Sequence, residues 1–237
     1  MLKNILLSNK YEKREGMVNM IRNPVNTNQK LHVAESYGSL SVMYEKGPMI
    51  ENYLGKLHGV LHAALLDYSR VFAFRVDLRL PEWMKGDDAQ ISSDIISKFV
   101  ESFKAKIKHN RLCAKKQNPY AHDTVVRYVW ARELGDHNHV HHHVAFMLNG
   151  DAFCALGNFI LGNDNMFNRL NEAWASALGL SIEIALGLVH IPENASYHIR
   201  RGDHQSISEF FYRASYLCKA NTKHYGNGHH GFGASRR

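Results

Sequence analysis

The sequence is poor in the residues that mark secreted or membrane proteins. Its three cysteines, Cys113, Cys154 and Cys218, are an odd number without paired spacing, which argues against a disulfide scaffold or a structural zinc knuckle. The N-terminal apolar run Ile5-Leu6-Leu7 is too short for a signal-peptide core, and nowhere do about 18 apolar residues stand together. These absences predict a cytoplasmic protein with no membrane partner.

Acidic residues are also under-represented, with 22 Asp and Glu against 29 Lys and Arg, a formal charge of +7. A basic balance predicts a polyanionic partner, with nucleic acid ahead of membrane because no strongly amphipathic basic helix stands out. A hydrophobic content of 45% over 237 residues suffices for one sizeable core. We expect a poorly ordered or accessory arm over 1–45, a folded domain over 46–220, and a basic, flexible Gly/His-rich tail over 221–237.

A histidine cluster at residues 139–149 runs into an apolar, β-prone segment. In a strand, alternate side chains share a face, so His141 and His143 would project together about 7 Å apart. Two imidazoles placed in this way can share one metal ion. His139 and His141 form a second candidate ligand pair.

The preceding run, 124–133, is β-branched and aromatic, and the segment joining it to the cluster is turn-like. Folding the two runs into a hairpin sets Glu133 opposite His141 and predicts a His/His/carboxylate metal site. The alternation of side chains along the two strands supports this hairpin. Bulky apolar residues fall on one face, and the other face carries Ala131, Glu133, His141 and His143. We expect the first face to pack on helices and the second to carry the chemistry.

Periodicity predicts an α+β fold. Helical spacing predicts helices over 50–68, 92–110 and 165–180, and a further helix starting at Ser206 or Ser208. Alternating or β-prone runs predict strands over 70–80, 124–133, 139–149 and 185–191. From residue 70 the order is β-α-β-β-α-β, the split-βαβ pattern of a ferredoxin-like antiparallel sheet with helices on one face.

Cationic side chains gather where a nucleic-acid backbone could contact them. They lie on the polar face of strand 70–80, at the end of helix 92–110, on the last helix and in the tail. The candidate DNA-binding residues are Arg75, Arg79, Lys108, Arg111, Lys115, Lys116, Arg213 and Lys223. Local ion pairs on a solvated face, favourable contact with a helix dipole and a disordered terminus explain the same residues equally well.

On the last predicted helix, Tyr212 and Tyr216 are four residues apart and Lys219 follows three residues later, so all three share a face. A divalent metal, a tyrosine nucleophile and a lysine that steadies phosphate charge together suit phosphodiester transesterification. The products would be a 5′-phosphotyrosine and a free 3′-hydroxyl. Imidazole and carboxylate ligands favour Mn²⁺, with Mg²⁺ as the alternative on grounds of abundance.

These residues resemble the HUH endonucleases, which initiate rolling-circle replication. Glu133 followed eight residues later by His141-His142-His143 is similar to the spacing in phage replication proteins of that superfamily, and residues 212–219 resemble its Tyr-x-x-x-Tyr-x-x-Lys signature. More narrowly, residues 50–237 look like the prophage YagK/YfjJ C-terminal domain and inovirus gene II-type replication proteins. The middle HUH position is usually hydrophobic and here is His142, so the His139/His141 register stays open.

The resemblance implies an HUH endonuclease fold, with His141, His143 and Glu133 as metal ligands, Tyr216 as the primary nucleophile and Tyr212 as the auxiliary one. It further implies a DNA-nicking and strand-joining initiator for a phage, prophage or satellite element. This enzyme would act in a bacterial cytoplasm on single-stranded or extruded origin DNA, with a host helicase and replication machinery as partners. The alternatives are a transposase or relaxase of the same superfamily and a non-catalytic DNA-binding regulator that retains the fold.

Overall fold

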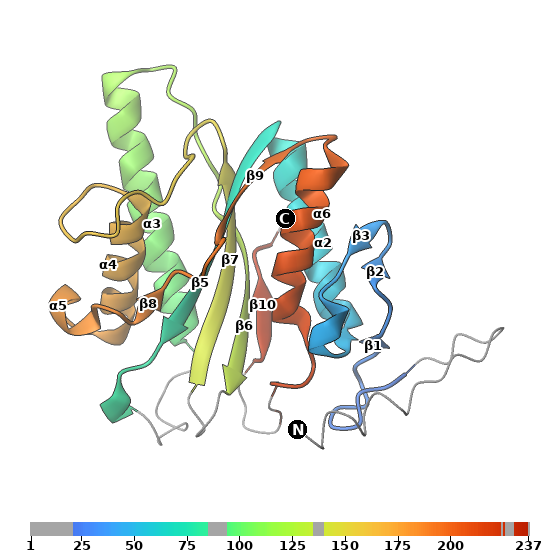
Figure 1. Cartoon of the computed structure of the whole chain (residues 1–237). Helices are drawn as coiled ribbons and strands as arrows, with labels where there is room; N and C mark the ends of the chain where they lie inside the picture. The colour runs from blue at the N-terminus through green and yellow to red at the C-terminus, as the bar shows by residue number, and fades with distance from the viewer. Residues whose placement is uncertain (1–20, 85–93, 135–139, 224, 226–229, 237) are drawn as a thin grey trace.

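The computed structural model describes residues 21–84, 94–134, 140–223, 225 and 230–236. At its centre is an antiparallel sheet in which β10, β6, β7 and β5 lie side by side, and both β8 and β9 pair with the far edge of β5 (Figure 1). The strands are β5 (Arg70–Arg79), β6 (Arg127–Leu134), β7 (Val140–Asn149), β8 (Val189–His190), β9 (Ser196–Arg200) and β10 (Phe232–Ala234). The predicted hairpin is confirmed as β6 and β7.

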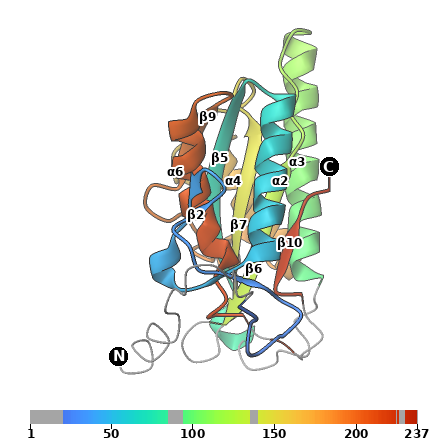
Figure 2. The ribbon, with the colours of Figure 1, turned by 90° about the vertical axis from the view of Figure 1, so that its right-hand side faces the viewer.

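Helices cover both faces of the sheet (Figures 1 and 2). On one face, α3 (Ile95–Gln117) and α4 (Met166–Leu178) pack on large side chains such as Phe72 and Phe146. On the other, α2 (Glu51–Asp67) and α6 (His204–Ser215) pack on smaller ones, among them Ala73, Ala131 and Ala145. The expectation of helices on one face was therefore wrong, because small apolar residues beside the histidines let a second helical layer approach.

The strand expected over 185–191 is mostly absent. A short helix, α5 (Ile182–Ala185), occupies its start, and Gly187 adopts a positive φ of 83° before the two-residue β8. A turn of this kind breaks a strand. The longer strand at this edge of β5 is instead β9, in a segment where no strand was expected, and the buried Ile199 anchors it to the core. Helix α3 also runs beyond 110 to Gln117, since nothing stops it before Pro119.

Both ends of the described chain belong to the fold. Residues 21–50 form short strands and a 3₁₀ turn whose apolar side chains are buried against α2 and α6, so the expected arm is wrong for the described part of 1–45; residues 1–20 lie outside the described residues. These elements are β1 (Leu31–His32), β2 (Ser36–Tyr37), β3 (Leu40–Ser41), η1 (Tyr44–Lys46) and β4 (Met49–Ile50).

Part of the expected flexible tail is a sheet strand. β10 pairs with β6, and the buried Phe232 ring stacks on Tyr53 with centroids 4.3 Å apart. Gly233 is required here, because a Cβ at this position would lie 2.5 Å from the Trp130 ring. Among the described residues, no helix has the length and apolar character needed to cross a membrane.

Replacement of Phe232 by alanine tests whether the tail stabilises the domain. We expect the free energy of unfolding to fall by about 3 kcal/mol, as for other buried phenylalanines, measured by urea denaturation. Leu66→Ala, at a residue that is 66% exposed, is the control and should change it by less than about 0.5 kcal/mol. Equal effects of the two changes would contradict the placement of β10.

Candidate metal centre

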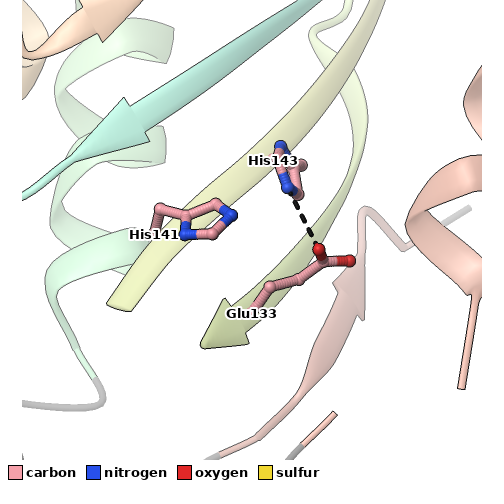
Figure 3. Close-up of side chains that lie close together, drawn as sticks. All are labelled: Glu133, His141 and His143. Atoms are coloured by element: carbon pink, nitrogen blue, oxygen red, sulfur yellow. Dashed lines mark hydrogen bonds and ion pairs between the residues drawn. The ribbon is translucent and has the colours of Figure 1, made fainter. Parts of the chain in front are cut away.

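Glu133, His141 and His143 meet at one end of the β6–β7 pair (Figure 3). The register sets Glu133 opposite His141 and Ala131 opposite His143, so the three side chains project from the same face. One ligand atom from each residue lies within 4.8 Å of those of the other two. The structure therefore brings together the three residues predicted from the sequence as metal ligands.

His142 projects from the opposite face, where its ring contacts Trp130 and Trp174. This is the consequence of the two-residue strand period. It leaves His141-x-His143 as the pair that lies beside Glu133. His139, the other candidate of the alternative register, lies outside the described residues.

The Glu133 carboxylate is only 2% exposed and is surrounded by cationic groups. The Lys219 ammonium lies 3.0 Å from Oε2, and the Lys223 ammonium donates to Oε1 at 2.8 Å. Burial alone would raise the pKa of Glu133, but the hydrogen bond with His143 and the charges of Lys223, His143 and Lys219 outweigh burial and hold its pKa far below the usual range. Glu133 is therefore an ionised, buried carboxylate.

Asp77, on β5, is a member of the site that the sequence reasoning missed. Its Oδ1 lies 2.6 Å from His143 Nδ1, and Arg75 donates to both of its oxygens at 3.1 and 3.3 Å. Burial would raise the pKa of Asp77, but its contacts with His143 and Arg75 lower it. Alternation along β5 sets Asp77 on the same face as Arg75 and Arg79, but only the β5–β7 register shows that it lies opposite His143.

The donor set fits a divalent metal. An ionised carboxylate only accepts hydrogen bonds, so Asp77 fixes one proton of His143 on Nδ1 and turns Nε2 toward Glu133 Oε2 at 3.2 Å. The hydrogen bond to Glu133 needs a second proton on Nε2, and a divalent ion held by Nε2 and Oε2 would replace that proton. A carboxylate behind a ligating histidine is also the usual outer partner at metal sites. Glu133, His141 and His143 would hold the ion.

Tyr216 lies beside this cluster. Its ring centroid is 5.5 Å from that of His143, and the Lys219 ammonium and the Arg75 guanidinium pack on the ring at 3.6 and 4.6 Å. Helix α6 ends at Ser215 and continues as the 3₁₀ turn η4 (Tyr216–Cys218). This tightened turn brings Lys219 back over Tyr216 and Glu133.

Tyr212 is oriented differently from Tyr216. Its hydroxyl donates to Glu45 Oε1 at 2.6 Å, and this hydrogen bond raises the pKa of the Tyr212 phenol. The expected shared helical face was therefore wrong, because α6 ends at Ser215: Tyr216 and Lys219 lie at the cluster beyond the helix, while Tyr212 contacts Glu45.

The candidate DNA-binding residues separate into groups. Arg75 and Lys223 are buried within the cluster, so the exposed positions expected for them are wrong. Arg79 is exposed at the end of β5, opposite His141, and Arg213 donates to the Glu193 carbonyl. The remaining residues, Lys108, Arg111, Lys115 and Lys116, lie on α3, which packs on the sheet face opposite the cluster.

Comparison with known proteins identifies the family of this chain. The family model described as the YagK/YfjJ C-terminal domain matches residues 32–235. The chain belongs to this family. It is 30% identical over 202 residues to the uncharacterized protein YfjJ of Escherichia coli (strain K12), covering 81% of this chain and 97% of the relative. Identity to the uncharacterized protein YagK of the same organism is 29% over 198 residues, covering 80% and 95%. No solved structure matches.

Replacement of Asp77 by asparagine tests the proposed orientation of His143. An amide cannot act as a charged acceptor for Nδ1–H, so we expect the affinity for Mn²⁺ to fall by roughly 10- to 100-fold, measured by isothermal titration calorimetry. His109→Ala, at an exposed histidine of α3, is the control and should leave Mn²⁺ binding unchanged. Equal affinities of Asp77→Asn and the unaltered protein would contradict the role of Asp77.

Replacement of Lys223 by methionine tests competition for Glu133. The ammonium and a divalent ion repel each other at the same carboxylate, and a unit charge at close range contributes about 1 kcal/mol or more. We therefore expect Mn²⁺ to bind about fivefold or more tightly to Lys223→Met, measured by the same calorimetry. Circular dichroism controls for folding, and weaker binding by a folded variant would refute competition.

Proposed function

We propose that this protein is a metal-dependent, single-stranded DNA endonuclease and transesterase that nicks and rejoins DNA through a tyrosine. One observation carries the proposal: a tyrosine and a lysine, Tyr216 and Lys219, pack directly against a cluster of Glu133, His141 and His143 that suits a divalent ion. This combination of groups has a specific use in phosphodiester chemistry.

The strand arrangement supports an HUH endonuclease fold. Numbered along the chain from residue 70, the sheet order is fourth-first-third-second, with the fourth position shared by β8 and β9 and with α3 and α4 as the two crossovers. This is the order of the ferredoxin-like split βαβ unit. The histidines lie on the third strand, in the centre of the sheet, where both neighbouring strands contribute side chains to the site.

Each side chain has a part in the proposed reaction. The Tyr216 hydroxyl attacks the scissile phosphorus, the bond from phosphorus to the 3′ oxygen breaks, and the tyrosine proton ends on the released 3′-hydroxyl. The strand stays attached through its 5′ phosphate to Tyr216. Lys219 stabilises the charge of the phosphate oxygens, and Asp77 keeps His143 correctly oriented. A bound Mn²⁺ or Mg²⁺ would supply polarisation of the phosphate.

Rejoining follows from the reversibility of this exchange, because the phosphotyrosine keeps the energy of the phosphodiester. The two tyrosines are not equivalent in the structure, since Glu45 holds the Tyr212 hydroxyl while Tyr216 lies at the cluster. This asymmetry supports Tyr216 as the first nucleophile and Tyr212 as the second, used when a strand is passed on.

The biological role that agrees with this chemistry is initiation of rolling-circle replication for a phage, prophage or satellite element in a bacterial cell. The substrate would be single-stranded or extruded origin DNA, with a host helicase opening the duplex. Relaxases and transposases share the same chemistry and remain the alternative. A non-catalytic DNA-binding regulator of the same fold would bind DNA in the presence of chelator without cleaving it.

Replacement of each tyrosine by phenylalanine tests the assignment. We expect Tyr216→Phe to abolish the covalent protein–DNA adduct, since the attacking oxygen is lost, whereas Tyr212→Phe should still form it but lose transfer to a second strand. Denaturing electrophoresis with labelled origin strands measures both steps. Tyr120→Phe, at a tyrosine that is 91% exposed, is the matched control. A full-strength adduct in Tyr216→Phe would refute Tyr216 as the nucleophile.

A further inference from the structure

A second cationic feature lies away from the metal centre, in a groove of about 660 Å³ between α3 and the edge of the sheet. One wall is α3, and the other is formed by residues 123–126, Tyr128 and the C-terminal residues 234–236. Figure 2 shows the C-terminal segment beside α3. Its cationic residues are Lys104, Lys108, Arg111, Lys115 and Arg236.

The groove is distinct from the site proposed for nicking. Tyr128, in its wall, lies on β6 five residues before Glu133, which is about 17 Å along a strand. Tyr128 packs with the α3 and α4 core, whereas Ala131 belongs to the other face, on which His141 and His143 also project. The sheet therefore separates the groove from the metal centre.

The positive charge of the groove is available to a ligand. Carboxylates of Glu101 and Asp123 pair with Lys104 and Lys115 at 2.8 and 2.5 Å, and all four side chains are substantially exposed. Exposed pairs of this kind contribute little, so a phosphate can replace the carboxylates. Arg111 is held in place, since its guanidinium packs on the Phe153 ring at 4.4 Å and donates to the His122 carbonyl.

The groove also has apolar surface. Leu112 and Val125 line it and are 52% and 54% exposed, and the Tyr128 ring lies beneath the Lys104 ammonium at 5.4 Å. Cations along an apolar and aromatic wall suit a nucleic-acid single strand, whose phosphates and unstacked bases are both accessible. A duplex hides its base faces and would gain nothing from this wall.

We propose that the groove between α3 and β10 is a second binding site for single-stranded nucleic acid. It would hold a strand on the face of the sheet opposite the metal centre, independently of metal and of cleavage. A protein that nicks one strand exposes single strands on both sides of the nick, and this groove provides a place for one of them while the metal centre holds the other.

The test compares two pairs of lysines on the same helix. Lys108→Gln with Lys115→Gln removes two charges from the groove, and Lys98→Gln with Lys106→Gln removes two charges of α3 that do not line it. Binding of a fluorescein-labelled single-stranded oligonucleotide is followed by anisotropy in EDTA at several salt concentrations. The chelator separates this result from the nicking test, because no metal-dependent step contributes.

We expect the groove pair to weaken single-strand binding roughly tenfold and to reduce the salt slope by about 1.4, the value for two phosphate contacts. The control pair should change the affinity less than twofold, and a matching duplex should bind the unaltered protein more weakly than the single strand. Equal losses in both pairs would overturn the groove as the binding site. Equal binding of duplex and single strand would overturn the assignment of its ligand.

Discussion

The structure depends on how one buried carboxylate is compensated. Glu133 is ionised and almost completely buried. Burying an unpaired charge costs several kcal/mol, and the ion pairs with Lys219, Lys223 and His143 offset this cost. Both lysines follow α6 in the chain. The segment after the last helix must therefore return to the end of β6, which fixes the tightened turn at Tyr216 and leads the chain toward β10.

The groups that surround Glu133 are those that the proposed reaction uses. Two imidazoles, a tyrosine ring and an ammonium group lie next to one another around the carboxylate. Arg75 contacts both sides of the site, since its guanidinium donates a hydrogen bond to Asp77 and packs on the Tyr216 ring. The orientation of a candidate ligand and the position of the candidate nucleophile thus depend on one arginine of β5.

Local sequence patterns predicted the residues of the hairpin site, but they did not predict the elements that pack around it. Strand parity and a short hairpin predicted that His141 and His143 face Glu133 but left His139/His141 as an open alternative; the register sets His141 opposite Glu133 and His143 opposite Ala131. Asp77 could not be assigned, because strand pairing between β5 and β7 spans 66 residues of sequence. The second helical layer was not predicted because the face of the sheet that carries the small alanine side chains was expected to have no helix on it. Strand β10 was not predicted because its glycine-rich sequence indicates a flexible tail, and its contact with Trp130 is visible only in the fold. The burial of Lys223 depends on Glu133 and could not be read from a basic tail.

The most direct test of the central claim is whether a metal ion makes the protein attach itself to DNA. Purified protein is incubated with labelled single strands from its own genetic element in Mn²⁺, in Mg²⁺ and in EDTA, and the products are separated on a denaturing gel and mapped by mass spectrometry. The account predicts a band shifted by a DNA fragment only with metal, with the nucleotide on the peptide that contains Tyr216. Absence of an adduct on every strand, together with tight binding in EDTA, would contradict it and favour a DNA-binding regulator.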